Sequence, residues 1–136
     1  MYRTIIVPVD LSQEQKGRDI LARALILRDS GARIVLVNVV EPIPGHIANE
    51  LPAGLLDASR HDAADKLRTI ASDAGIDAHV EVRTGHPANE ILELAQEQDA
   101  DLIIVGSHRP GLQDYFIGST ASRVVRHALC SVLVTR

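Results

Sequence analysis

The chain has 136 residues, a formal net charge of -4 with acidic and basic residues interspersed, and a single cysteine, Cys130. This length fits one domain over residues 1–136, which buries roughly two thirds of the surface that its unfolded form exposes. The composition offers no basic patch for nucleic acid, no apolar run near the roughly 20 residues of a membrane helix, and no cysteine pair for an internal disulfide. We therefore expect a soluble, cytoplasmic protein that binds no nucleic acid and inserts into no membrane.

Five short segments of the sequence predict β-strands. Four are nearly continuous runs of apolar, largely β-branched residues, which is typical of strands buried on both faces. The third segment along the chain instead alternates polar and apolar side chains, which predicts a half-exposed edge strand. In chain order the predicted strands are residues 4–9, 33–40, 78–83, 101–105 and 131–135.

Four helices are predicted between these strands from apolar residues at helical spacing. The first begins where Ser12 and Gln15 form a capping box, the second ends at Gly75, the third opens at Pro87, and the fourth runs over residues 119–128. The residues that we expect them to bury are Ile20, Leu21, Ala24 and Leu25 in the first, Leu56, Ala63, Leu67, Ile70 and Ala74 in the second, Ile91, Leu92 and Ala95 in the third, and Val124 and Val125 in the fourth.

The resulting order, βαβαβαβαβ, predicts an α/β fold. Strict alternation, with helices on both faces, gives a doubly wound parallel sheet of five strands joined by right-handed crossovers. Residues 41–56 hold three prolines and two glycines without a clear period. They predict a long excursion after the second strand, which is either a functional lid or contact surface, or a tolerated surface insertion.

The loop after the first strand is the first candidate site, because open α/β sheets bind ligands beyond the carboxyl ends of their strands. Pro8, Val9 and Asp10 lead there from the strand into the helix. The Asp10 carboxylate can accept hydrogen bonds from a ribose or an adenine amine. The alternative is an aspartate that only caps the helix.

The loop after the fourth strand combines glycines with a helix start. Glycines let a backbone approach a phosphate closely, and a helix start offers free N–H groups. The segment matches neither a Walker A loop nor the GxGxxG of a dinucleotide-binding fold, so glycine content alone favours a plain connection. The residues of this candidate site are Gly106, Ser107, His108, Arg109, Gly118, Ser119 and Thr120.

Over essentially its whole length the sequence resembles the universal stress protein family. The resemblance lies in IIVPVD at residues 5–10, GHP at 85–87, ADLIIVGSH at 100–108 and GSTASRVVRHALCSVLVTR at 118–136. It implies a Rossmann-like sheet with strand order 3-2-1-4-5. That order sets the first and fourth strands side by side and makes their loops the two walls of one crevice.

The same resemblance implies a nucleotide site. ATP-binding members carry the signature G-2x-G-9x-G-(S/T), and by analogy Asp10 contacts the adenosine, Val39 lies near the adenine, and the glycine loop and helix start hold ribose and phosphates. The cofactor-binding residues that we expect are Pro8, Val9, Asp10, Val39, Gly106, Ser107, His108, Arg109, Gly118, Ser119 and Thr120.

The sequence departs from this signature at one point. Arg109 stands where the pattern has its second glycine, and the stretch to Gly118 is one residue short. Pro110 favours an extended Arg109, whose planar donors can offer a phosphate a charge-assisted pair in place of backbone contacts. This Ser-His-Arg-Pro version resembles the F-type branch of the family, which implies that ATP binding is retained.

These observations predict an ATP-binding regulatory protein of the stress response. We expect it to bind its nucleotide without hydrolysing it at an appreciable rate, because no catalytic residue can be named from the sequence. Magnesium would accompany the triphosphate, and ADP or AMP are alternative ligands. The alternative function is a protein-interaction module without nucleotide. A phosphoacceptor receiver or a flavodoxin-like carrier is disfavoured, because a receiver needs an acidic residue after strand three and a lysine after strand five.

The last strand predicts an oligomer, because it lies at an exposed edge in the implied order, where a second chain can pair. Val132, Leu133 and Val134 would meet their symmetry mates in a homodimer, with a tetramer through residues 41–56 or a monomer as alternatives. Six scattered histidines predict no structural metal. The regulatory protein partner stays unknown at this stage.

Overall fold

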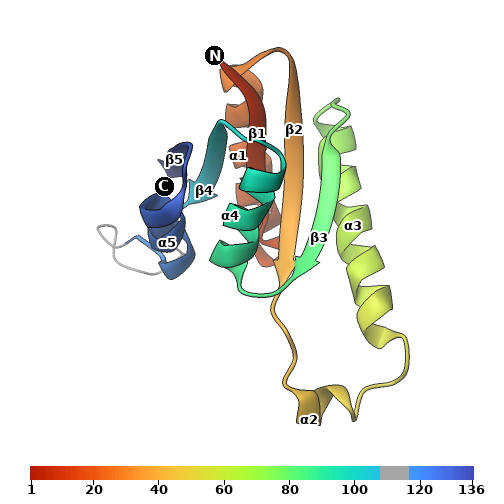
Figure 1. Cartoon of the computed structure of the whole chain (residues 1–136). Coiled ribbons are helices and arrows are strands. Elements are labelled where there is room, and N and C mark those ends of the chain that lie inside the picture. The colour runs from red at the N-terminus through yellow and green to blue at the C-terminus, as the bar shows by residue number, and fades with distance from the viewer. Residues whose placement is uncertain (108–116) are drawn as a thin grey trace.

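The computed structural model describes residues 1–107 and 117–136, and its core is a five-stranded, all-parallel sheet in the order β3-β2-β1-β4-β5 (Figure 1). The predicted α/β fold and strand order are confirmed. The strands are β1 (Tyr2–Pro8), β2 (Arg28–Val40), β3 (His79–Thr84), β4 (Leu102–Gly106) and β5 (Ser131–Thr135). The helices are α1 (Glu14–Leu27), α2 (Gly45–Ala48), α3 (Leu55–Asp73), α4 (Pro87–Glu97) and α5 (Ser119–His127), with a 3-10 turn η1 (Leu11–Gln13).

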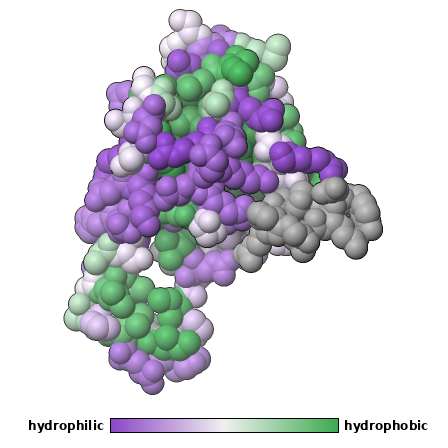
Figure 2. All heavy atoms as spheres, turned by 180° about the vertical axis from the view of Figure 1, so that it is seen from behind, coloured by the Kyte–Doolittle hydropathy of each residue, from purple (hydrophilic) through white to green (hydrophobic). Residues whose placement is uncertain are grey.

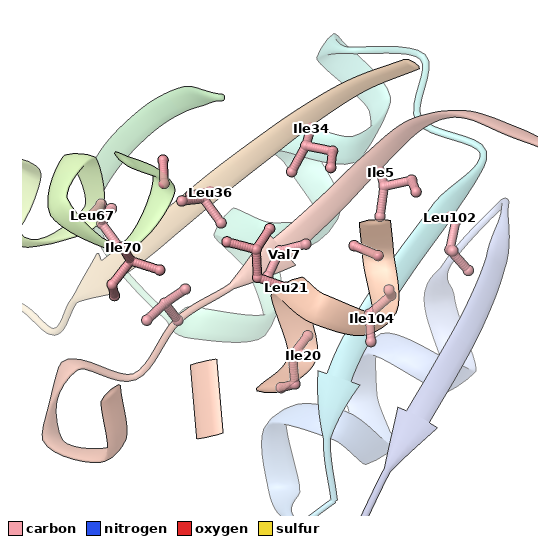
Figure 3. Close-up of a cluster of buried hydrophobic side chains, with 13 residues drawn as sticks. Ile5, Val7, Ile20, Leu21, Ile34, Leu36, Leu67, Ile70, Leu102 and Ile104 are labelled. Carbon is pink, nitrogen blue, oxygen red and sulfur yellow. The ribbon is translucent and has the colours of Figure 1, made fainter. Parts of the chain in front are cut away.

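Two apolar layers, one on each face of the sheet, form the core. Side chains alternate along a strand, so Ile5 and Val7 of β1 pack with α1 and α3, whereas Ile6 packs with α4 and α5. Figure 3 shows the first layer, where Leu67 and Ile70 of α3 lie near β2. Because both faces of the central strands are covered, these strands need apolar residues at nearly every position.

Strand β2 is longer than the sequence predicted. It begins at Arg28, directly after α1, instead of at residue 33. Its early part is polar and mostly exposed, so it carries no apolar pattern, yet its backbone still pairs with β1. The register shifts between the pair Tyr2 with Arg28 and the pair Thr4 with Arg33. An irregular, solvated pairing of this kind leaves no signal in hydrophobic periodicity.

Three residues expected in the core are exposed, and those predictions were wrong. Leu56 is 44% exposed and Val125 46% exposed, and Ala74, at the end of α3, is also exposed. The lower end of α3 projects beyond the strands toward α2 (Figure 1), so its first turn has no sheet to pack against. In α4 the fully buried leucine is Leu94, whereas Leu92 is half-buried.

Two helix boundaries agree with the sequence. Gly75 follows α3 with φ at +72°, and the N–H of Ile76 donates to the Ala71 carbonyl at 3.1 Å, which closes the helix end as expected. Pro87 is the first residue of α4. Proline costs nothing there because the first N–H of a helix has no intrahelical acceptor.

Asp101 joins the starts of β1 and β4, which pair at only two positions, Ile5 with Leu102 and Ile6 with Ile103. Its carboxylate accepts the backbone N–H groups of Arg3 and Thr4, each at 2.9 Å. Burial alone would raise the pKa of this carboxyl, but the backbone hydrogen bonds and the nearby Arg3 charge together outweigh burial and lower the pKa. The carboxylate form therefore stabilises the central strand pair.

We expect Asp101→Asn to lower the free energy of unfolding by about 1 kcal/mol at pH 7. Because the pKa of Asp101 is lower in the folded state, its contribution is present above the unfolded-state pKa of about 3.9 and is lost as pH falls through the folded-state pKa. Urea unfolding of both proteins between pH 7 and pH 3 measures this, and the two stabilities should converge toward pH 3. A constant difference over that range would contradict the assignment.

The excursion after β2 carries a short helix, α2, that the sequence did not predict. Figure 2 shows hydrophobic side chains gathered at this end of the molecule. Among the described residues, no helix has the length and apolar character needed to span a bilayer. The large exposed apolar side chains of this excursion and of the start of α3 are Ile43, Ile47, Leu55 and Leu56.

Candidate switch-point cleft

A cleft of about 590 Å³ opens at the carboxyl ends of β1 and β4. These strands are neighbours in the sheet, but the chain leaves them in opposite directions, from β1 to α1 on one face and from β4 toward α5 on the other. This is the topological switch point, where the connecting loops separate and leave room for a ligand.

The described residues around the cleft include nine of the eleven that the sequence predicted. They come from three places: the end of β1 and its loop, the end of β2, and the segment from β4 to α5. His108 and Arg109 lie outside the described residues, so the predicted effect of Arg109 on phosphate binding stays a prediction. The nine are Pro8, Val9, Asp10, Val39, Gly106, Ser107, Gly118, Ser119 and Thr120.

The first wall is the loop after β1, which β2 holds in place. The Val9 N–H donates to the Val37 carbonyl at 2.8 Å, and the Val9 carbonyl accepts the Asn38 side-chain amide at 2.9 Å. Val9 is buried, whereas Asp10 is exposed. The backbone is therefore fixed on both sides of Val9, which sets the direction in which Asp10 leaves the strand.

Asp10, not Ser12, caps the helical segment that follows. The Asp10 Oδ1 accepts the Ser12 N–H at 2.9 Å and the Ser12 hydroxyl at 2.6 Å. The Gln15 side chain bonds Asp19 at 3.0 Å instead of reaching back. The predicted capping box was wrong, because a tight turn, η1, precedes α1 and moves the cap two residues toward the strand. Asp10 therefore caps the turn, and it also borders the cleft. Its contact with a ribose or an adenine stays a prediction.

The second wall is the segment that joins β4 to α5. The Ser107 N–H donates to the Thr135 carbonyl at 2.8 Å, and the Ser107 carbonyl accepts the Gly118 N–H. Ser107 is 2% exposed, so this segment is held against the end of β5. The first intrahelical bond of α5 runs from Ser122 N–H to the Gly118 carbonyl. The earlier N–H groups of α5, at residues bordering the cleft, have no acceptor within the helix and carry its positive dipole end.

Sequence reasoning missed several residues of the cleft, and Lys16 is the most informative of them. Lys16 is the third residue of α1 and is half-buried. In the sequence it is a single lysine in an amphipathic helix, a pattern typical of a solvated face. The signal that could have found it is position, because the first turn of α1 starts where β1 delivers the chain to the cleft. The other missed residues include Ser12, Gln13, Asn38, Glu41 and Pro87.

These features define a Rossmann-like α/β protein with a ligand cleft at the switch point, bordered by a carboxylate, a lysine and a helix start. The model of the universal stress protein family matches residues 1–136. The chain belongs to the universal stress protein family, and the resemblance noted in the sequence is confirmed.

Known members resemble the chain over its full length. Universal stress protein G of Escherichia coli O157:H7 is 34% identical over 145 residues, with 100% of each chain covered. The solved structure of universal stress protein UspA from Lactobacillus plantarum is 28% identical, with a TM-score of 0.72 and coverage of 99% of this chain and 98% of that one. A universal stress protein crystallised in complex with cAMP is 22% identical, with a TM-score of 0.68 and coverage of 99% and 97%, a likeness that shows the shared fold.

Proposed function

We propose that this chain is an ATP-binding regulatory protein of the stress response, which holds an adenine nucleotide in the switch-point cleft and acts through occupancy of that cleft. The observation that carries the proposal is the convergence, in one cleft, of a carboxylate from the β1 loop and of N–H groups at the start of α5 that have no acceptor within the helix. A cAMP complex of another member of the family supports a nucleotide as the class of ligand.

The two walls suit different parts of the nucleotide. Asp10 and Val39 border the side that would take adenosine, where the carboxylate accepts from ribose hydroxyls or the adenine amine. Gly106, Ser119 and Thr120 border the side that would take phosphates, because N–H groups at a helix start attract anions. Magnesium would bind through the phosphate oxygens of ATP. We propose binding without turnover.

The proposal extends to assembly and location. We infer one domain over residues 1–136, located in the cytoplasm, and a homodimer formed along β5, the last strand at one end of the sheet. In the part of the chain that the structure describes, no strand lies beside its outer edge. Val132, Leu133 and Val134 are partly exposed along this edge. A second copy of β5 would pair the unused backbone groups and cover these side chains.

A protein-interaction module without nucleotide is the second candidate function. The exposed apolar side chains of the excursion favour it, since a gathered apolar surface often marks a contact site. Under this alternative the cleft binds nothing, and the fold serves only to present the excursion.

Calorimetric titration of ATP, ADP and AMP into nucleotide-stripped protein, with magnesium, separates the two functions. We expect saturable binding of ATP with a dissociation constant of about 1 to 100 μM, which corresponds to roughly 5 to 8 kcal/mol. Light scattering on the same preparation should give twice the chain mass of 14.7 kDa. Folded protein that shows no heat with any of the three nucleotides would favour the interaction module.

A further inference from the structure

The Lys16 side chain lines the cleft and reaches from α1 to Gly106 at the end of β4. If Gly106 carried a Cβ atom, that atom would lie 2.7 Å from Lys16 Cε and 3.4 Å from Lys16 Nζ. The lysine therefore occupies the space that the missing side chain leaves, and its ammonium lies near the position that a Gly106 Cβ would take.

The start of α5 lies beside the same segment. The Gly118 N–H donates to the carbonyl of Ser107, the residue after Gly106. The ammonium of Lys16 and the positive end of the α5 dipole thus border two consecutive residues, the last of β4 and the one that follows it. Two sources of positive potential at one wall of a cleft favour an anion there far more than either alone, because the surrounding protein screens charges less than water does.

The charges of the described cleft residues are arranged by side. Asp10 and Glu41 follow the ends of β1 and β2, which form the side proposed for adenosine. Lys16 contributes the positive side chain at the end of β4, the side proposed for phosphates. A nucleotide with its base and ribose toward β2 and its phosphates toward β4 meets the matching charge at each end.

We propose that Lys16 is a phosphate-binding residue of the cleft, and that its ammonium makes the site favour nucleotides with several phosphates over the bare nucleoside. This inference rests on the proposed function and names the group that selects the ligand. Lysine suits the task as a compact charge with three donors on a flexible stem, which can follow the β- or γ-phosphate. Gly106 is then needed for the path of the lysine as well as for close approach of the ligand.

The test is Lys16→Met, which keeps the unbranched stem and the helix propensity and removes the charge. The only other lysine of the chain, Lys66, provides a matched control as Lys66→Met, since it lies on α3, outside the cleft lining, and pairs with Asp62. Titrations use ATP, adenosine and inorganic tripolyphosphate at low and high salt. We expect Lys16→Met to weaken the binding of ATP and tripolyphosphate about tenfold or more and to change the affinity for adenosine less than twofold. The salt dependence of ATP binding should also fall.

The outcomes separate this inference from the proposed function. Wild-type protein that binds ATP, together with a Lys16→Met variant that binds it within twofold, overturns the role of Lys16 and leaves the nucleotide site standing. Lys16-dependent binding of tripolyphosphate without any nucleotide binding supports the phosphate-binding role and overturns the nucleotide function. Wild-type protein that binds neither ATP nor tripolyphosphate overturns both the role of Lys16 and the nucleotide function. Equal losses of affinity for ATP and for adenosine in Lys16→Met also overturn the phosphate-specific role.

Amine labelling gives a second readout that does not depend on a variant. The chain offers two lysine side chains to an acylating reagent, and mass spectrometry resolves the labelling rate of each. ATP at saturating concentration should slow acylation of Lys16 at least fivefold and leave Lys66 unchanged. An unchanged rate at Lys16 in the presence of bound ATP would contradict contact between its ammonium and the phosphates.

Discussion

Gly106→Val is expected to weaken ATP binding by about 10- to 100-fold while the protein remains folded. The new Cβ would lie 2.7 Å from Lys16 Cε, so the lysine must move, and the branched side chain enters the cleft where phosphates are proposed. A 10- to 100-fold loss of affinity corresponds to about 1.4 to 2.7 kcal/mol of binding free energy. The position ends a strand, where valine is well suited, and the crowded atoms belong to the far part of a flexible side chain.

Gly45→Val is the matched control for this substitution. A Cβ at Gly45 would meet no atom within 4 Å, and this residue lies in α2, away from the cleft lining. Calorimetric titration and thermal unfolding of both variants measure the effect. ATP affinity should fall only in Gly106→Val, with melting temperatures of both variants within a few degrees of the wild type. Equal ATP affinities in two folded variants would mean that the nucleotide does not use the wall at β4.

Leu67→Ala should lower the free energy of unfolding by about 2 to 5 kcal/mol, a large part of the roughly 5 to 15 kcal/mol that stabilises a domain. Leu67 is 0% exposed and packs in the layer that covers β1 and β2. The side chains around it cannot collapse fully into the space, so the variant loses both transfer free energy and contacts. Alanine is the better helix former, so the loss comes from packing and not from helix propensity.

Leu56→Ala is the same substitution in the same helix, at a side chain that is 44% exposed. We expect it to change the free energy of unfolding by less than about 1 kcal/mol. Urea titrations of both variants at one pH and temperature give the comparison. A similar loss in both variants would show that Leu56 is covered in solution, for example in an oligomer.

The fold was predictable because its strands are strongly patterned. A strand buried on both faces must be apolar at nearly every position, and residues 5–7 of β1 and 102–105 of β4 satisfy this. The predictions that were wrong concern segments whose side chains do not have to be buried. The early part of β2 pairs through its backbone while its side chains meet solvent, and the first turn of α3 keeps helical apolar spacing although no sheet lies beneath it.

The candidate site was predictable where it depends on the backbone. Glycines and a helix start have a recognisable place after β4, and the loop after β1 must reach the same edge of the sheet. Lys16 depends instead on how α1 crosses β4, a tertiary relation that no local pattern encodes. The same applies to Asn38, whose amide fixes Val9 from a neighbouring strand. Side chains recruited from adjacent elements are therefore the part of the site that only the structure reveals.

The parallel sheet also determines where labels can be attached. Met1 precedes β1 at the amino ends of the strands, opposite the cleft, and its amino group pairs with Asp29. Arg136 follows β5 at the carboxyl ends, next to Thr135, whose carbonyl holds Ser107. An affinity tag or fluorophore fused before Met1 therefore leaves the cleft accessible. A fluorophore fused after Arg136 lies at the rim of the cleft, where its emission can report ligand entry.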